Sequence, residues 1–349
     1  MTIVFFVLIF GGIVLAHEFG HYLLAKVNGI HVVEFAIGMG PKLAGFHKNG
    51  TDYVIRLLPL GGACMFEGED GLNEEEAGPS ENSFNAASVG ARISAVVAGP
   101  FFNFILAFLL GILIVGLGGS DSPVIQGVMP GYPAEEAGML PGDRVVKMNG
   151  ERIRVAREVS LITYRNQGEP IEIEYTRDGK TYTATITPKY DETAGKYLIG
   201  WQGYMEYVEP KGLDLFKLSF YEVRYSLKAT VKSLGMLIEG KATKDDLAGP
   251  VGIAQVIGEV AKESSEYGPL VVLLNLSNIA LLLSVNLGVL NLLPFPALDG
   301  GRLVFLLVEA VRGKPIPPEK EGMVHFAGFV ALMVLMVFVL YNDIIRLFA

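Results

Sequence analysis

Four long apolar runs dominate the pattern of hydrophobic and polar residues along the chain. Each run is long enough to cross the roughly 30 Å hydrocarbon core of a bilayer as a helix. The first run lacks the charged start and the small-residue cleavage site of a signal peptide, so we expect a retained helix. The runs cover about residues 3–25, 94–117, 269–293 and 323–341.

Two basic residues indicate how these helices are oriented. Lys26 follows the first run and Arg92 precedes the second, and basic residues collect in cytoplasmic loops close to the ends of spans. We therefore expect residues 26–93 and 294–321 on the cytoplasmic side of the membrane. Residues 119–268 and both termini are then expected on the outer side.

Residues 30–66 are predicted to form a β-hairpin region associated with the membrane. Val32–Ile37 and Tyr53–Leu58 have the composition of strands, and Asn49-Gly50 is a strong turn signal. The stretch is apolar enough to enter the inner leaflet, provided that protein shelters its backbone. A small soluble hairpin is the alternative.

The chain becomes less hydrophobic between residues 122 and 205, where short strands alternate with turns. This pattern predicts a small β domain. Residues 206–268 form a linker that contains an amphipathic, partly basic helix. Such a helix fits either the membrane surface or a contact with the β domain. The strands predicted in the β domain are Val124–Met129, Arg144–Met148, Ile171–Thr176 and Thr181–Thr187.

Composition agrees with a membrane protein. Of the 349 residues, 51% are hydrophobic and only 19% are charged, and the net charge of -9 argues against nucleic acid as a partner. Cys64 is the single cysteine. An intrachain disulfide and a cysteine zinc site are therefore excluded.

His17, Glu18 and His21 form a zinc-hydrolase motif at the end of the first run. Residues four apart share a helix face, so both imidazoles can bind one metal ion with Glu18 beside them as a base. Ionisable residues inside a membrane helix are costly and usually functional, which favours a metal site over two interfacial histidines that flank a glutamate. At about 1.5 Å per residue, His17 lies within the membrane, toward its cytoplasmic face.

Asp299 is the predicted third ligand, because a catalytic zinc ion usually takes three from the protein. An extended motif with a third histidine fails, since Leu24 and Val27 occupy the required positions. Pro294 and Pro296 end the third apolar run. The two glycines that follow Asp299 then let the chain return toward the histidines, and zinc is the expected cofactor.

Two asparagines are placed where a polar side chain is unusual. Asn291 is close to Asp299 in sequence and could donate a hydrogen bond to an oxyanion. The alternative is an Asp299 that caps a helix and an Asn291 that packs. Asn103, inside the second run, is predicted to make an interhelical hydrogen bond. The remaining histidines have no ligand spacing: His31, His47 and His325.

Gly131–Val145 is similar to the PDZ signature of bacterial proteases. Together with His17–His21 and Asn291–Gly301, it makes the chain resemble the site-2 protease family of intramembrane metalloproteases, in its bacterial RseP/RasP group. The resemblance covers nearly the whole chain. It implies an α-helical membrane protein with four transmembrane helices, a membrane-associated β-hairpin region and one extracytoplasmic PDZ-like β domain. This chain differs from family members with two PDZ domains, because it has room for only one.

The resemblance implies an intramembrane zinc endopeptidase of a bacterial inner membrane. It would cleave transmembrane segments of other membrane proteins, either anti-sigma factors or signal-peptide remnants, with Glu18 as general base and then acid. Besides these substrates and the lipid bilayer, a peptide bound by the PDZ-like domain is an expected partner. Two alternatives are open: a metal or ion transporter, and a non-catalytic membrane scaffold that binds peptides.

A helical substrate must become extended before it is cut, because its carbonyls are hydrogen-bonded to its own backbone. Opening the helix in lipid would leave backbone groups unpaired, and a strand of the protease could pair with them. The strand predicted for this role, from its composition and its closeness to the motif, consists of Tyr53, Val54, Ile55, Arg56, Leu57 and Leu58.

Overall fold

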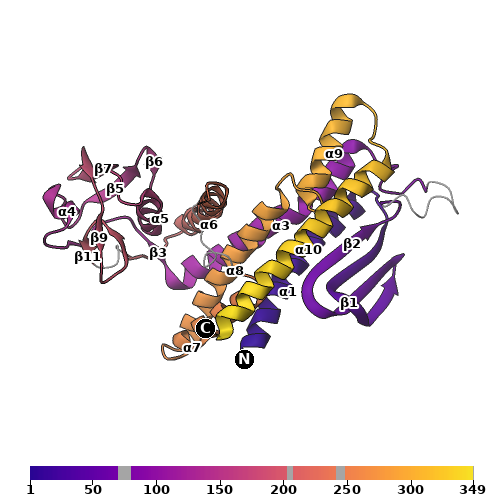
Figure 1. Cartoon of the computed structure of the whole chain (residues 1–349), viewed down its shortest axis with the longest axis horizontal. Coiled ribbons are helices and arrows are strands. Elements are labelled where there is room, and N and C mark those ends of the chain that lie inside the picture. The colour runs from indigo at the N-terminus through magenta and orange to yellow at the C-terminus, as the bar shows by residue number, and fades with distance from the viewer. Residues whose placement is uncertain (70–79, 203–206, 241–247, 349) are drawn as a thin grey trace. The chain divides into compact units, whose positions relative to one another are not determined.

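The structure is a computed structural model that describes residues 1–69, 80–202, 207–240 and 248–348 (Figure 1). Parts of the predicted β domain and linker, residues 203–206 and 241–247, therefore lie outside the described residues. The chain divides into two compact units. Unit 1 comprises Met1–Leu110 and Thr230–Ala349, and unit 2 comprises Gly111–Ala229.

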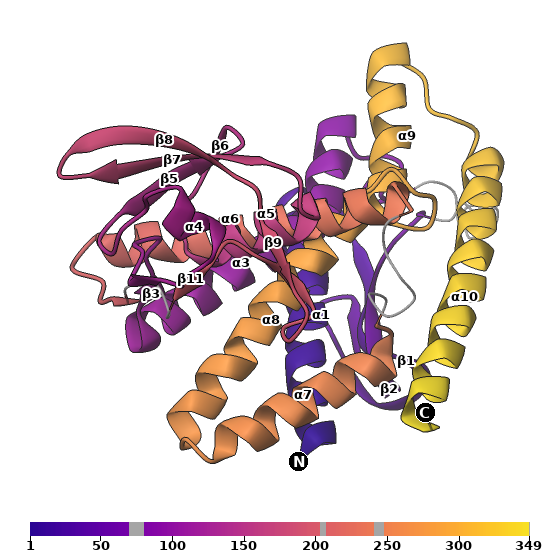
Figure 2. The same cartoon turned by 60° about the vertical axis from the view of Figure 1, so that its left-hand side comes forward.

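Four helices in the described part of the chain are long and apolar enough to cross a membrane, which confirms the four predicted spans. Between them, α7 (Pro250–Ser265) joins the third span at a sharp turn (Figure 2), and α9 (Asp299–Arg312) follows that span. The four long helices are α1 (Thr2–Val27), α3 (Val89–Gly118), α8 (Pro269–Asn291) and α10 (Pro318–Phe348).

The helices α1 and α3 approach closely because a glycine lies at their contact. A Cβ atom added to Gly20 would lie 2.3 Å from the backbone oxygen of Ala98, so a larger residue would push the two helices apart. Small residues let membrane helices gain packing contacts where lipid removes the hydrophobic driving force. The spacing of α1 and α3 is therefore set by Gly20.

Polar contacts fix two more helices against α3. On α8, Ser284 donates a hydrogen bond to the Asn103 backbone oxygen at 2.8 Å. On α9, Glu309 accepts two hydrogen bonds from the buried guanidinium of Arg92, at 3.0 and 2.5 Å. A paired, bidentate contact of this kind satisfies a charge that would otherwise be costly to bury.

A bent hairpin of two long strands, β1 (Val32–Lys48) and β2 (Thr51–Phe66), follows α1. Asn49 and Gly50 connect the strands, and both have positive φ, as a tight two-residue turn requires. The first half of β1 pairs with two separate stretches of β2, residues 52–55 on one side and 62–66 on the other. The predicted hairpin region is thus confirmed. Parts of both strands are paired on two sides, whereas each strand of a simple two-stranded ladder is paired on one side.

This register changes the prediction for the substrate strand. Residues 53–55 pair with both the first and the second half of β1, so neither edge of Tyr53–Ile55 is open to another strand. Ile55, Leu57 and Leu58 are instead exposed. In the described part of the chain, Gly62–Phe66 pairs with β1 on one side only.

Unit 2 contains a small β domain. Three of the four predicted strands agree with the structure, and the first is reduced to β4 and a single bridge at Val124. A sheet with the order β6-β5-β7-β8 packs with α4 and α5 around a core that includes Met148, Ile171 and Ile173. The strands are β3 (Ser120–Asp121), β4 (Gly127–Val128), β5 (Arg144–Met148), β6 (Glu151–Arg152), β7 (Ile171–Arg177), β8 (Lys180–Ile186), β9 (Lys189–Asp191), β10 (Lys196–Leu198), β11 (Trp201–Gln202) and β12 (Tyr207–Val208), and the helices are α4 (Pro133–Glu136) and α5 (Arg157–Asn166).

The amphipathic helix α6 (Asp214–Ile238) uses charged residues to contact this β domain. Arg224 pairs with Glu158 of α5 at 2.5 Å. At the start of α5, Arg157 pairs with both Asp121 and the buried Glu222 of α6. The basic face of α6 is therefore used within unit 2, while apolar side chains such as Phe216 and Phe220 are exposed.

We predict that Arg157→Met destabilises unit 2 by about 2 kcal/mol at neutral pH, below the roughly 3–5 kcal/mol of a fully buried pair because Arg157 is 43% exposed. Burial raises the pKa of Glu222, and Arg157 opposes that rise. A raised carboxyl pKa contributes stability below its unfolded value and loses it as pH rises. The loss of unfolding free energy in the variant should therefore become smaller toward acid pH.

Trp201 is the only tryptophan of the chain, and it lies in unit 2. Its fluorescence during chemical unfolding of the full-length protein therefore reports on this unit. Lys180→Met, at an exposed position of the same unit, is the control. A deficit that is equal at pH 5 and pH 8 would contradict the role given to Glu222.

Candidate metal centre

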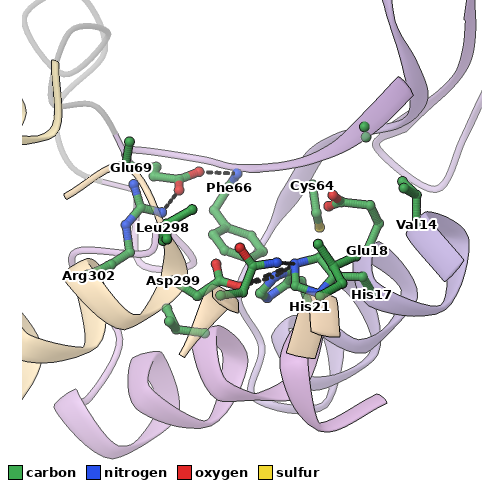
Figure 3. A pocket seen from close by; sticks show the side chains of 16 residues that line it. Val14, His17, Glu18, His21, Cys64, Phe66, Glu69, Leu298, Asp299 and Arg302 are labelled. Carbon is green, nitrogen blue, oxygen red and sulfur yellow. Dashed lines mark hydrogen bonds and ion pairs between the residues drawn. The ribbon is translucent and has the colours of Figure 1, made fainter. Parts of the chain in front are cut away.

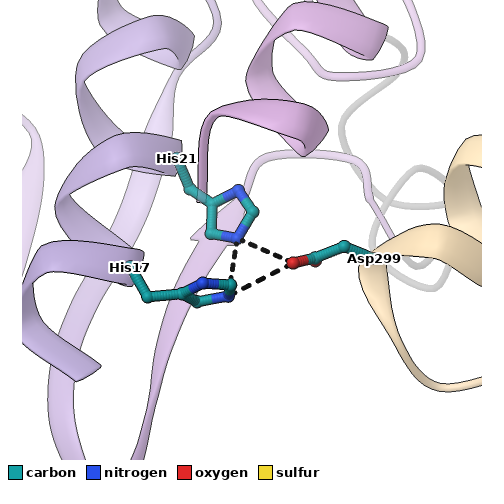
Figure 4. Close-up of side chains that lie close together, drawn as sticks. All are labelled: His17, His21 and Asp299. Atoms are coloured by element: carbon teal, nitrogen blue, oxygen red, sulfur yellow. Dashed lines mark hydrogen bonds and ion pairs between the residues drawn. The ribbon is translucent and has the colours of Figure 1, made fainter. Parts of the chain in front are cut away.

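The structure brings together three side chains that can bind a metal ion. His17 and His21 lie one turn apart on α1, and Asp299 is the first residue of α9 (Figure 4). The two histidine Nε2 atoms are 3.2 Å apart, and Asp299 Oδ2 lies 3.2 Å from one and 3.4 Å from the other. No other histidine, cysteine or carboxylate triple in the described ranges has this geometry.

The size of this triangle fits zinc. Bonds of about 2.0–2.1 Å to nitrogen and oxygen, in tetrahedral geometry, place the ligand atoms about 3.3 Å from one another. The observed separations of 3.2–3.4 Å agree with that value. Asp299 Oδ2 is also buried and has no hydrogen-bond partner in the described residues, as expected of an atom that binds a metal ion. Two imidazoles and one carboxylate also leave one of four positions open, as in a catalytic site.

The His21 ring is held by α3. Its Nδ1 lies 2.8 Å from the Ala95 backbone oxygen, so Nδ1 carries the proton and Nε2 is free for a metal ion. Gly99 provides the space for the ring, because a Cβ atom there would lie 2.2 Å from His21 Nε2. The contact between α1 and α3 thus determines where this ligand points.

Glu18 lies beside the three ligands in a cavity of about 320 Å³ (Figure 3). Glu18 is 8% exposed. A Cβ atom on Gly62 would lie 2.7 Å from Glu18 Cγ. The edge of β2 therefore forms one wall of the cavity and packs against the Glu18 side chain.

Asn291 reaches the same space from the end of α8. Its Nδ2 lies 3.4 Å from His17 Nε2, and it lines the cavity. The predicted strand Tyr53–Leu58 does not line the cavity, whereas Gly61, Gly62, Cys64 and Phe66 do.

Three histidines are used elsewhere. His31 pairs with Glu67, His47 pairs with Asp52, and His325 accepts a hydrogen bond from the Ala297 backbone N–H. None of them belongs to the triangle of ligand atoms.

The sequence of residues 5–335 matches peptidase family M50. The chain belongs to this family. It is 36% identical to the zinc metalloprotease RasP of Geobacillus kaustophilus, over 99% of this chain and 98% of that one. It is 34% identical to the regulator of sigma-W protease RasP of Bacillus subtilis, over 99% of both chains, and 36% identical to a putative zinc metalloprotease of Clostridium acetobutylicum, over 99% of this chain and 97% of that one.

These relatives confirm the prediction of a membrane-embedded zinc metalloprotease with Zn²⁺ as its cofactor. They set aside the transporter and the non-catalytic scaffold. The alignment with the Geobacillus protein extends over 423 positions, although this M50 peptidase has 349 residues, whereas the Clostridium alignment extends over 351. The longer relatives therefore contain residues that this chain lacks.

One solved structure, the PDZ domain of an SdrC-like protein from Listeria monocytogenes, aligns with 24% of this chain and 86% of that one. The identity is 20% and the TM-score is 0.22. A likeness this weak carries no argument, so the PDZ-like nature of the β domain stays a prediction from the sequence.

Sequence reasoning missed several residues around the cavity. Arg302 and Glu69 line it and form an ion pair, and Glu69 also accepts a hydrogen bond from the Phe66 backbone N–H at 3.0 Å. Arg302 follows Asp299 by one helical turn, which was a usable signal. The roles of Ala95 and Gly99 have no signal in the sequence, because both are ordinary residues of an apolar helix.

We predict that Gly99→Ala lowers zinc affinity at least tenfold, because the new methyl group collides with the His21 ring and displaces its Nε2. Helix stability cannot account for the loss, since alanine favours a helix by about 1 kcal/mol over glycine. Zinc retained after dialysis against a graded chelator series measures the effect.

The matched control is Gly90→Ala on the same helix, where a Cβ atom meets nothing within 4 Å. This control should hold zinc like the unmodified protein. Equal zinc retention in both variants would mean that Gly99 does not constrain the ligand.

Proposed function

We propose that His17, His21 and Asp299 hold the zinc ion of this M50 peptidase, and that Glu18 is its general base. The observation that carries the proposal is the triangle of ligand atoms beside a buried carboxylate in one cavity. The helical spacing of His17 and His21, and the position of Asp299 at the start of α9, account for that arrangement.

The bound zinc ion would polarise the scissile carbonyl and make the attacking water more acidic. Glu18 accepts the proton of that water and later delivers it to the leaving amine. The close packing of Gly62 against Glu18 Cγ restricts where the carboxylate can lie. Asn291 Nδ2 donates a hydrogen bond to the oxyanion that develops on the substrate.

We predict that Glu18→Gln keeps about one zinc ion per chain and slows cleavage at least 100-fold, the usual range for loss of a general base. Glutamine preserves the size of the side chain but cannot take up a proton. Cleavage of a membrane-embedded reporter substrate in proteoliposomes and zinc content by mass spectrometry are measured on the same preparation.

The control is Glu67→Gln, which changes a carboxylate that pairs with His31 outside the cavity. It should cleave at nearly the unmodified rate. His17→Ala and Asp299→Ala should lose zinc and cleavage together. Full zinc occupancy and activity in Asp299→Ala would show that Asp299 is not a ligand. An active Glu18→Gln variant would show that Glu18 is not the general base.

The substrate segment is proposed to bind in an extended form along Gly62–Phe66. Cutting within a membrane helix requires its backbone groups to find new partners, each worth several kcal/mol in lipid. In the described residues, this stretch of β2 pairs on one side only, and its other side faces the cavity. It replaces Tyr53–Ile55, whose two edges are already paired, as the proposed site of strand addition.

The only cysteine offers a direct test of this pairing. We predict that Cys64, in the Glu18→Gln background, forms disulfides with single cysteines placed along the substrate segment. Reactive positions should recur every second residue, because side chains alternate along a strand. Gel mobility under non-reducing conditions detects the cross-links.

The control moves the thiol to the exposed position 55, as Cys64→Ala with Ile55→Cys. At position 55 both strand edges are occupied, so cross-linking should be weak and should not recur at a regular spacing along the substrate. Reactivity from Cys64 that recurs every three to four residues would indicate a bound helix, and the strand-addition proposal would then be wrong.

The orientation and the role of unit 2 are also proposed. Lys26 and Arg92 support a bacterial inner-membrane location with residues 26–93 in the cytoplasm and the β domain outside the cell. In that orientation the β domain would screen substrates by the size of their outer part. A groove of about 320 Å³ between α5 and residues 196–201 could hold an extended peptide.

Two substrate classes fit this arrangement. The Bacillus subtilis relative is called a regulator of sigma-W protease, which supports membrane-bound anti-sigma factors as substrates. Remnants of signal peptides are the second class, because they are short apolar segments with little mass outside the membrane.

A further inference from the structure

Asn103 lies at the centre of the contact between α1 and α3. Its side chain is completely buried, and its Nδ2 lies 3.2 Å from His17 Nδ1. Its Oδ1 is buried without a hydrogen-bond partner in the described part of the chain. The predicted interhelical hydrogen bond is thus found, and its partner is a ligand of the proposed metal centre.

The protonation of His17 decides how this amide must point. His17 Nε2 is one corner of the triangle of ligand atoms, so Nε2 must be free of a proton when a metal ion is bound. A neutral imidazole then carries its proton on Nδ1. With Nδ2 of Asn103 toward it, two donors would face each other, and the amide oxygen would stay unpaired.

A half-turn of the amide resolves both problems. Its oxygen and nitrogen are nearly indistinguishable in shape, and their assignment follows from the hydrogen-bond network. With Oδ1 toward His17, the Nδ1–H donates to it at the same 3.2 Å separation. This orientation gives the buried oxygen a partner and directs the Nε2 lone pair toward the ion.

The two ligand histidines would then be held in the same way by one face of α3. Ala95, Gly99 and Asn103 follow one another at intervals of four residues, which places them in a row on the helix. The first offers its carbonyl oxygen to His21 Nδ1, the second leaves space for the His21 ring, and the third contacts His17.

We propose that Asn103 is a positioning residue for the metal centre: its amide oxygen accepts the His17 Nδ1–H and fixes the tautomer and direction of that ligand. The proposal rests on the ligand set proposed above. Partners of this kind orient ligands and raise their basicity, and their replacement commonly lowers metal affinity about 10–100-fold.

The test compares two substitutions of similar size. Asn103→Leu removes the acceptor and should weaken zinc binding about 10–100-fold, measured by competition with a fluorescent chelator on full-length protein in detergent. Asn103→Asp keeps an oxygen at this position, so its zinc affinity should equal or exceed that of the unmodified protein. In cobalt-substituted protein, the visible absorption of a four-coordinate site should be preserved in Asn103→Asp and changed in Asn103→Leu.

Ser284→Ala is the matched control. It removes the hydrogen bond to the Asn103 backbone oxygen and leaves the amide side chain in place, so it perturbs the same helix contact without touching His17. It should bind zinc within twofold of the unmodified protein. Thermal unfolding of the zinc-free proteins shows whether a variant has simply lost its fold, and Asn103→Asp, which retains the acceptor, tests the proposal independently.

Two results would overturn the proposal. One is zinc affinity in Asn103→Leu within twofold of the unmodified protein. The other is an equal loss in Asn103→Asp and Asn103→Leu, which would indicate packing alone. His17→Ala is measured in parallel: if that variant also keeps its zinc, the ligand set itself is wrong, and the two failures are distinguished.

Discussion

The close contact between α1 and α3 is the constraint on which the rest of the metal centre depends. Two imidazoles inside a membrane need partners for their second nitrogens, because water is scarce there and an unpaired polar group is costly. A small residue at position 20 brings the backbone of α3 near enough to supply one partner directly, the Ala95 carbonyl. A wider helix spacing would leave both rings free to turn.

The remaining elements complete the site from the other side. Glu309 and Arg92 hold α9 against α3, which places Asp299 at the start of α9 opposite the histidines. The edge of β2 closes the cavity and packs against Glu18 at Gly62. Each ligand or acid–base group is therefore fixed by a different neighbour, and no single element contains the whole centre.

The parts of the site that the sequence predicted are those with short-range signals. His17 and His21 are recognisable because a helix places residues four apart on one face, and Asp299 because two prolines and two glycines force a turn beside a carboxylate. Asn103 was identified as polar in an apolar run, but its contact spans 86 positions of sequence and has no local signature. The open strand edge has no local signature either: composition identifies Tyr53–Leu58 as a strand but does not reveal that residues 53–55 are paired on both sides.

The row Ala95, Gly99 and Asn103 also has a consequence for how this chain can change over evolutionary time. One inserted residue between positions 95 and 103 would rotate the following part of α3 by about 100°. Hydropathy would hardly alter, so the protein would still enter the membrane and keep its topology. The contacts before and after the insertion could nevertheless no longer face the two histidine rings at the same time. Insertion into the bilayer tolerates such a shift in helical phase, whereas the chemistry does not, and the length of this segment is therefore as much a part of the active site as the residues in it.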